Sequence, residues 1–91
     1  MAYEIKVSQA ALKTINKWRK SNPTLHKKCK KIFHELMDHP KSGTGHPEQL
    51  KGKGGSVYSR HITAQDRIIY EVFDDFLVVL VVALEGHYND K

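Results

Sequence analysis

Residues 57–84 read VYSRHITAQDRIIYEVFDDFLVVLVVAL, and this part of the sequence predicts most of the sheet. It divides into Val57–Thr63, Arg67–Phe73 and Phe76–Leu84, three runs rich in β-branched and aromatic residues, which are typical of strands. Short polar segments separate the runs and predict tight turns. We therefore expect an antiparallel meander. Because Phe76–Leu84 is apolar throughout, it predicts a central strand that is covered on both faces.

The residues before the meander predict one strand and two helices. Tyr3–Val7 alternates apolar and polar residues, as a strand does. Apolar residues recur at helical spacing in Gln9–Lys20 and again between Pro23 and Asp38. Ser8 and Asn22 are suitable N-caps for the two helices. The order β-α-α-β-β-β predicts an α+β fold, in which an N-terminal helical hairpin packs on an antiparallel sheet.

Length and composition exclude several classes of protein. The chain has 91 residues, which suits one domain (1–91) and is too short for two. Such a chain cannot enclose a large cofactor, and we expect none. Its one cysteine, Cys29, allows no internal disulfide and favours the cytoplasm. The longest apolar run, Phe76–Leu84, is too short to span a bilayer, and no apolar leader segment follows Met1, so we expect neither a membrane protein nor a secreted one.

Charge is distributed unevenly along the chain. Fifteen Lys and Arg residues against ten Asp and Glu give a net charge of +5. Nine basic residues and no acidic one lie between Ile5 and His34. A basic face on a small domain favours a polyanionic partner, most often nucleic acid. A solvated helix surface explains the same charge equally well.

Residues 39–56 form a long connection with two prolines and five glycines, a length typical of functional or mobile loops. Metal and nucleophile motifs are absent from the sequence. Cys29, His34 and His39 are spaced five apart, which turns successive side chains by roughly 140° on a helix, so they share no face. Cys29 lies on an apolar stripe and is predicted to be a core residue. The Lys51–Gly55 segment lacks the spacing of a phosphate-binding loop.

A few polar residues remain that the strands could bring together. Glu48 is the sole acidic residue between Asp38 and Asp66. The other members are Arg60, His61, Arg67 and the pair His87-Tyr88.

Taken singly, each has a structural explanation. Glu48 could be a surface charge, and His87-Tyr88 could lie at a frayed end. Arg60 and Arg67 could pair with Glu71 or Asp66.

Taken together, these groups can cut RNA through its own 2′-hydroxyl. That reaction needs a base, an acid for the leaving 5′-oxygen, and cations for the phosphorane charge. Glu48 can serve as the base, His87 as the acid and Arg67 as the cation. Lys51 and Arg60 could hold phosphate oxygens, and Tyr88 could stack on a base or orient the phosphate.

An ordered series of motifs resembles the YoeB (Txe) family of the RelE/ParE toxin superfamily. The motifs are His46–Gly52, Tyr58–Thr63, Asp66–Tyr70 and Gly86–Tyr88, and the resemblance covers nearly the whole chain. It implies a cytoplasmic toxin of a type II toxin–antitoxin system. Such a toxin cleaves mRNA in the A site of the 70S ribosome without metal. A YefM- or Axe-type antitoxin would neutralise it, and the pair would repress its own operon.

The resemblance also assigns residue roles. It places the general base on Glu48, the transition-state arginine on Arg67 and the general acid on His87. The family tyrosine falls on Tyr88 and the phosphate-side lysine on Lys51. Arg60 matches the first arginine of the family's Ser-Arg-Arg-Ile-Thr motif, and His61 replaces the second.

Two rival functions share these features in part. A ParE-like inhibitor of DNA gyrase would share the fold and the basic charge, but it would not need Glu48, His87 and Tyr88 together. The second rival is a relative that lost activity and only binds nucleic acid or antitoxin. It would keep these three residues but not their catalytic arrangement. The sequence leaves the codon preference open, and also whether two copies form a homodimer.

Overall fold

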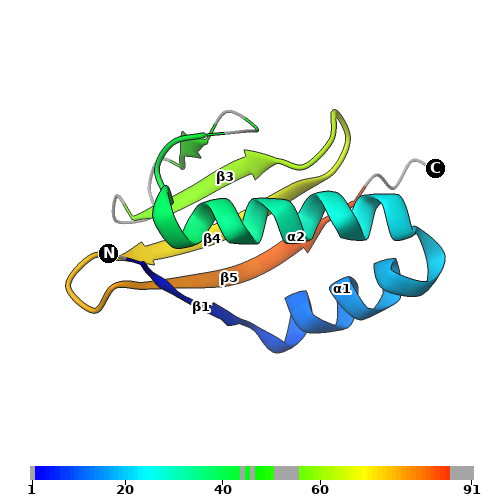
Figure 1. The fold of residues 1–91 in the computed structure, drawn as a ribbon, viewed down its shortest axis with the longest axis horizontal. Coiled ribbons are helices and arrows are strands. Elements are labelled where there is room, and N and C mark those ends of the chain that lie inside the picture. The colour runs from blue at the N-terminus through cyan, green and yellow to red at the C-terminus, as the bar shows by residue number, and fades with distance from the viewer. Residues whose placement is uncertain (1, 44, 46, 51–55, 87–91) are drawn as a thin grey trace.

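The computed structural model describes residues 2–43, 45, 47–50 and 56–86, which form two helices and a five-stranded sheet (Figure 1). In chain order the elements are β1 (Glu4–Val7), α1 (Gln9–Ser21), α2 (Pro23–Asp38), β2 (Glu48–Gln49), β3 (Val57–His61), β4 (Arg67–Phe73) and β5 (Val78–Glu85). The α+β class, the helical hairpin and the meander of β3, β4 and β5 are thereby confirmed.

The strand order across the sheet is β1-β5-β4-β3-β2. β3, β4 and β5 pair antiparallel, whereas β1 pairs with β5 in parallel, from Glu4 opposite Val78 to Val7 opposite Val81. The sheet is therefore mixed, not antiparallel throughout. The alternating pattern of Tyr3–Val7 predicts a strand, but it carries no information about the direction or the partner of that strand.

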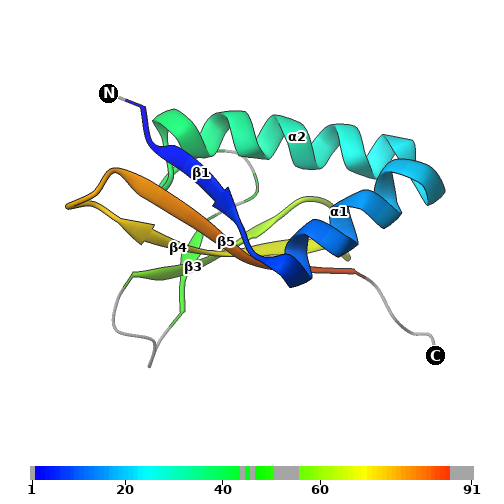
Figure 2. The same cartoon turned by 90° about the horizontal axis from the view of Figure 1, so that it is seen from below.

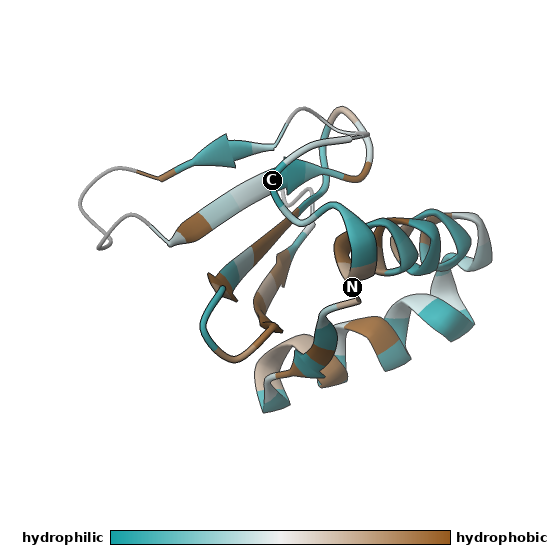
Figure 3. Ribbon diagram, turned by 60° about the vertical axis from the view of Figure 1, so that its left-hand side comes forward, coloured by the Kyte–Doolittle hydropathy of each residue, from teal (hydrophilic) through white to brown (hydrophobic). Residues whose placement is uncertain are grey.

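Both helices cover the same face of the sheet (Figure 2). The core between them contains Trp18 and Ile32 from the helices and Ile68, Tyr70 and Val81 from the strands. Hydrophobic residues accordingly concentrate on the inner strands and on one side of each helix (Figure 3). The prediction that the last strand is covered on both faces is wrong. Along β5 buried residues alternate with partly exposed ones, because no helix among the described residues covers the second face.

The helix boundaries follow from the capping residues. Ser8 Oγ accepts a hydrogen bond from the Ala11 amide at 3.1 Å, and Asn22 Oδ1 accepts one from the Leu25 amide at 3.2 Å. Each bond satisfies an amide in the first turn that has no partner within the helix. Cys29 is fully buried, as predicted, and burial raises the pKa of its thiol to about 12. The thiol therefore stays protonated at neutral pH and serves as a core residue.

Two details of the strands differ from the sequence prediction. The long connection contains a short edge strand, β2, which is too brief to show any periodicity. The last strand begins at Val78 instead of Phe76, because Phe76 and Leu77 belong to the turn after β4, where Leu77 has a φ of 54°. Phe76 is 76% exposed at this turn. Among the described residues, no helix is long and apolar enough to span a membrane.

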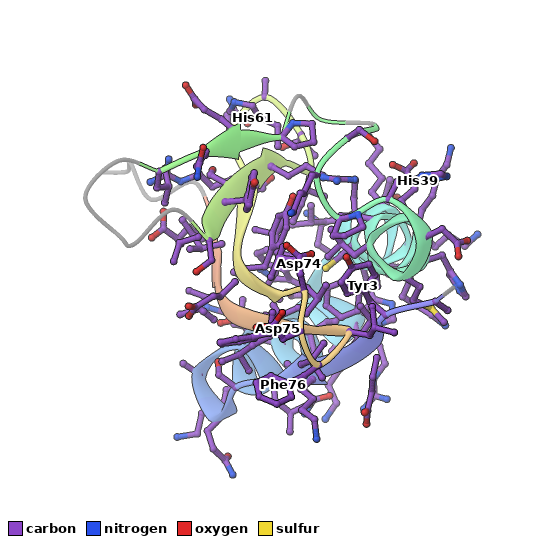
Figure 4. All side chains as sticks on the ribbon, turned by 90° about the vertical axis from the view of Figure 1, so that its left-hand side faces the viewer. Tyr3, His39, His61, Asp74, Asp75 and Phe76 are labelled. Atoms are coloured by element: carbon purple, nitrogen blue, oxygen red, sulfur yellow. The ribbon has the colours of Figure 1, made fainter. Side chains whose placement is uncertain are left out.

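The end of the sheet near this turn is tied to the N-terminal segment. The Tyr3 hydroxyl and the Lys41 ammonium each donate to the Asp74 carboxylate, at 2.7 and 2.6 Å. Figure 4 shows Tyr3 and Asp74 at this end, away from His61 near the opposite edge of the sheet. The hydrogen bond from Lys41 and, second, that from Tyr3 hold the pKa of Asp74 below its usual value.

Candidate active site

The uncovered face of the sheet, which we call the open face, carries most of the candidate site residues that the structure describes. Successive side chains of a strand point to opposite faces. On β3, the Arg60 side chain is directed toward the helices, because it contacts Glu35 of α2 at 3.1 Å. Its neighbours Ser59 and His61 therefore face away from the helices, on the open face.

The strand register extends this set across the sheet. Glu48 lies opposite Ser59, His61 opposite Arg67, and Arg67 opposite Glu85. Directly opposed residues share a face, so Glu48, His61, Arg67 and Glu85 all belong to the open face. Glu48 is on β2 and Arg67 is on β4, two strands away. Along the strand direction, the register offsets the two residues by two positions. Standard sheet spacings then put their Cα atoms roughly 12 Å from each other, a gap that a phosphodiester and its ribose can occupy.

Arg67 is held by Glu85. Its Nε donates to Glu85 Oε1 at 2.8 Å, and both side chains are nearly half exposed. An exposed ion pair of this kind contributes only about 0–1 kcal/mol to stability, so its main effect is on orientation. No other side-chain partner of Arg67 occurs among the described residues, and the terminal nitrogens can face a phosphate as a planar fork.

Glu48 and His61 are both exposed. Glu48 is kept in place through the backbone, because the Leu50 amide donates to the Val57 carbonyl at 2.8 Å and closes the pairing of β2 with β3. The His61 amide donates to the Gly45 carbonyl at 2.9 Å. The open face thus presents a carboxylate, an imidazole and a guanidinium to solvent. These groups can transfer protons and bind phosphate.

Comparison with known proteins decides the family. Residues 7–88 match the family model described as YoeB-like toxin of bacterial type II toxin–antitoxin system. The chain belongs to this family. It is therefore a toxin of a type II toxin–antitoxin system, related to the YoeB and RelE toxins.

Individual relatives agree with this assignment. Toxin YoeB from Escherichia coli O6:H1 (strain CFT073) is 35% identical over 71 residues, which cover 78% of this chain and 82% of that protein. Among solved structures, the YoeB/ParE toxin from Agrobacterium tumefaciens superposes with a TM-score of 0.84 at 25% identity, covering 93% of this chain and 99% of that one. The YoeB-YefM complex from Staphylococcus aureus gives 0.80 at 25% identity, covering 97% and 100%.

The position of Arg60 differs from the prediction that this residue binds phosphate. Its side chain is fully buried, and its guanidinium binds Glu35 and the carbonyl oxygens of His39 and Ser42. It has no access to a phosphate on the open face, so its assignment as a substrate-binding residue is wrong. The alternation of the strand gives the reason: His61 and Arg60 are neighbours, and only one of them can face the substrate side.

The ion pairs also differ from those proposed for the two arginines. Arg60 pairs with Glu35 and Arg67 with Glu85, whereas Glu71 accepts a hydrogen bond from the Ser56 hydroxyl at 2.9 Å. Sequence reasoning did not identify Glu85 at all. Its only signal is its position as the first charged residue after the apolar run, one residue beyond the position that a regular hairpin would pair with Arg67.

Lys51, His87 and Tyr88 lie outside the described residues. Their roles therefore stay predictions from the sequence. Among the residues that the structure does describe, no three His, Cys, Asp or Glu side chains are grouped so that they could hold a metal ion.

A groove of about 450 Å³ lies between the helical hairpin and the turn after β3. Lys17 and Trp18 line it from α1, Asp66 from the turn, and Leu84 and Gly86 from the end of β5. Because Leu84 faces the helices, this groove is on the covered side of the sheet. It is separate from the open face that bears Glu48 and Arg67.

Proposed function

We propose that this YoeB-family toxin is a ribosome-dependent endoribonuclease that cleaves mRNA in the ribosomal A site. The observation that carries the proposal is the shared open face of Glu48 and Arg67, with His61 between them in the register. A base and a cation on one exposed surface, with their Cα atoms roughly 12 Å apart by standard sheet spacings, suit attack on an RNA backbone. The strand β5 ends next to Arg67, and His87-Tyr88 follows two residues later in the sequence.

The proposed reaction uses the nucleophile within the RNA. Glu48 accepts the proton of the 2′-hydroxyl, and the 2′-oxygen attacks the phosphorus. The bond to the 5′-oxygen breaks as His87 donates a proton to that oxygen. Arg67 stabilises the negative charge of the phosphorane between these steps. The products are a 2′,3′-cyclic phosphate and a 5′-hydroxyl, and no step of this scheme is assigned to a metal ion.

The remaining roles concern binding. Lys51 and His61 would hold phosphate oxygens, and Tyr88 would stack on a base or orient the phosphate. The family motif has an arginine at the position of His61, so this chain offers an imidazole there instead of a planar guanidinium fork.

The basic helices form the proposed contact with ribosomal RNA. Lys27, Lys28, Lys30 and Lys31 are all exposed on α2. Replacing these four by alanine should weaken ribosome binding. It should also reduce the slope of log affinity against log salt by up to about one unit for each lysine in contact with phosphate. Binding titrations at several salt concentrations measure this, and an unchanged slope would show that the lysines only solvate the helix.

We also propose a cytoplasmic toxin with a neutralising partner of the YefM type. The structure from Staphylococcus aureus is a YoeB-YefM complex. The net charge of +5 and the partly exposed apolar residues of β5 would suit a partner segment that is both acidic and apolar. Such a segment orders itself when it binds.

Primer extension on a defined mRNA after induced expression in a bacterium tests the function. We expect cuts near start codons that disappear when translation of that mRNA is blocked. Growth arrest without cuts, but with inhibited DNA supercoiling, would favour a ParE-like gyrase inhibitor. Neither cuts nor growth arrest would identify an inactive relative.

A further inference from the structure

We propose that Arg60 is a positioning residue for Glu48. From the covered side of the sheet, its buried guanidinium holds the segment after α2, by which we mean residues 39–43 and 45, and so determines where the base stands on the open face. This inference rests on the proposed ribonuclease function, and it gives Arg60 a task that differs from phosphate binding.

The guanidinium of Arg60 joins three parts of the chain. Its Nη1 donates to Glu35 Oε1 on α2 at 3.1 Å. Its Nη2 donates to the carbonyl oxygens of His39 at 2.9 Å and Ser42 at 2.7 Å. The side chain is 0% exposed, and a buried charge is stable only when it is paired and hydrogen-bonded. The segment after α2 must therefore keep its carbonyls directed at Arg60.

Tyr70 provides a second attachment for the same segment. The centroid of its ring lies 5.7 Å from the Arg60 guanidinium carbon, and its hydroxyl donates to the Pro40 carbonyl at 2.7 Å. The ring is fully buried next to the guanidinium, so it packs against the cation while its hydroxyl binds the backbone. Arg60 and Tyr70 together bind the carbonyls of residues 40, 39 and 42.

Two glycines allow the segment to approach this closely. Gly43 and Gly45 have φ angles of 113° and 88°. A Cβ on Gly43 would lie 2.7 Å from Glu35 Oε1, and one on Gly45 would collide with the His61 carbonyl oxygen. Gly45 thus lies directly against β3, where its carbonyl accepts from the His61 amide. Only three residues after Gly45, Glu48 pairs with Ser59, the neighbour of Arg60.

These buried contacts matter because Glu48 must be positioned accurately to act as a base. A base must stand within hydrogen-bond reach of the proton that it removes, and a misplacement of about 1 Å can cost about 10²-fold in rate. β2 has only two residues to pair with β3, so its own ladder holds Glu48 weakly. The buried contacts of Arg60 supply the missing constraint.

The test compares Arg60→Lys and Tyr70→Phe with the wild type. Both variants keep bulk in the core, and each removes attachments of the segment. We expect single-turnover cleavage at saturating ribosomes to fall by about 10- to 100-fold. Ribosome affinity and its salt dependence should stay unchanged, because neither side chain reaches the open face. Lys41→Met is the matched control, since Lys41 lies on the same segment, but its side chain is nearly half exposed and its hydrogen bond goes to Asp74.

A second measurement does not depend on activity. The His61 and Leu50 amides, which bind the Gly45 and Val57 carbonyls, report on the segment and on β2. Their hydrogen exchange should accelerate by about tenfold or more in the variants, while amides of β4 and β5 keep their protection.

Each outcome bears on the proposal. Folded variants with faster exchange and wild-type cleavage would overturn it, as would unchanged exchange at both amides. Reduced affinity with a smaller salt slope would overturn it in favour of a phosphate contact. A wild-type protein that does not cleave at all would count against the proposed function, whereas the exchange data would still decide whether Arg60 holds β2.

Discussion

Alanine at Glu48 or at His87 should slow single-turnover cleavage of mRNA on purified ribosomes by about 10²–10⁴-fold, the usual contribution of one proton-transfer group. Ribosome binding should survive both changes, because the basic residues of α1 and α2 are untouched. The cleavage rate at saturating ribosomes and the affinity are measured separately, so that loss of chemistry is distinguished from loss of binding.

Matched controls are available for both residues. Glu4→Ala removes an exposed carboxylate from β1, at the opposite edge of the sheet from Glu48. His34→Ala removes an exposed imidazole from α2. Both should cleave at the wild-type rate. If Glu48→Ala and His87→Ala also cleaved at nearly that rate, the assignment of base and acid would be wrong, whatever the fold.

Replacing Arg67 by alanine should reduce the cleavage rate by about 10²–10³-fold, as the loss of one donor to a developing oxyanion does in other enzymes. Arg67→Lys should recover little of this. An ammonium offers no planar fork to two phosphate oxygens, and a lysine has no Nε–H at the position that donates to Glu85.

Glu85→Gln provides the comparison for this prediction. The amide oxygen of glutamine can still accept the hydrogen bond of Arg67 Nε, so we expect less than about a tenfold change in rate. A full rate in Arg67→Lys would show that charge alone is sufficient at this position. It would contradict a role for the guanidinium geometry.

Local signals in the sequence predict most of the fold. Ser8 and Asn22 mark the helix starts, and the helical spacing of the apolar residues gives the faces that pack on the sheet. β2 escapes prediction because two paired residues show no period. The direction of β1 depends on a partner more than seventy residues away, and a pattern of four residues holds no information about it.

The site is predictable in its composition but only partly in its geometry. Glu48, His61 and Arg67 do share a face, as strand alternation allows. Arg60 carries the same charge as Arg67, and nothing in its local sequence shows that it lies on the buried side. Glu85 reaches Arg67 because of an irregularity in the pairing of β4 with β5 at Ile69/Tyr70. Without that shift, Arg67 would face Leu84, and no propensity predicts such a bulge.

The pairing of β1 with β5 has a consequence for synthesis of the chain. Ser8 donates to the Val82 carbonyl across a sequence separation of 74 residues. While the chain is being made, β1 and α1 emerge first, and both lack the strand on which they pack. The sheet can close only after its last strand has left the exit tunnel, and closing so long a loop is slow compared with forming the helices. A folded toxin domain therefore cannot exist until the ribosome has made the chain at least through Glu85.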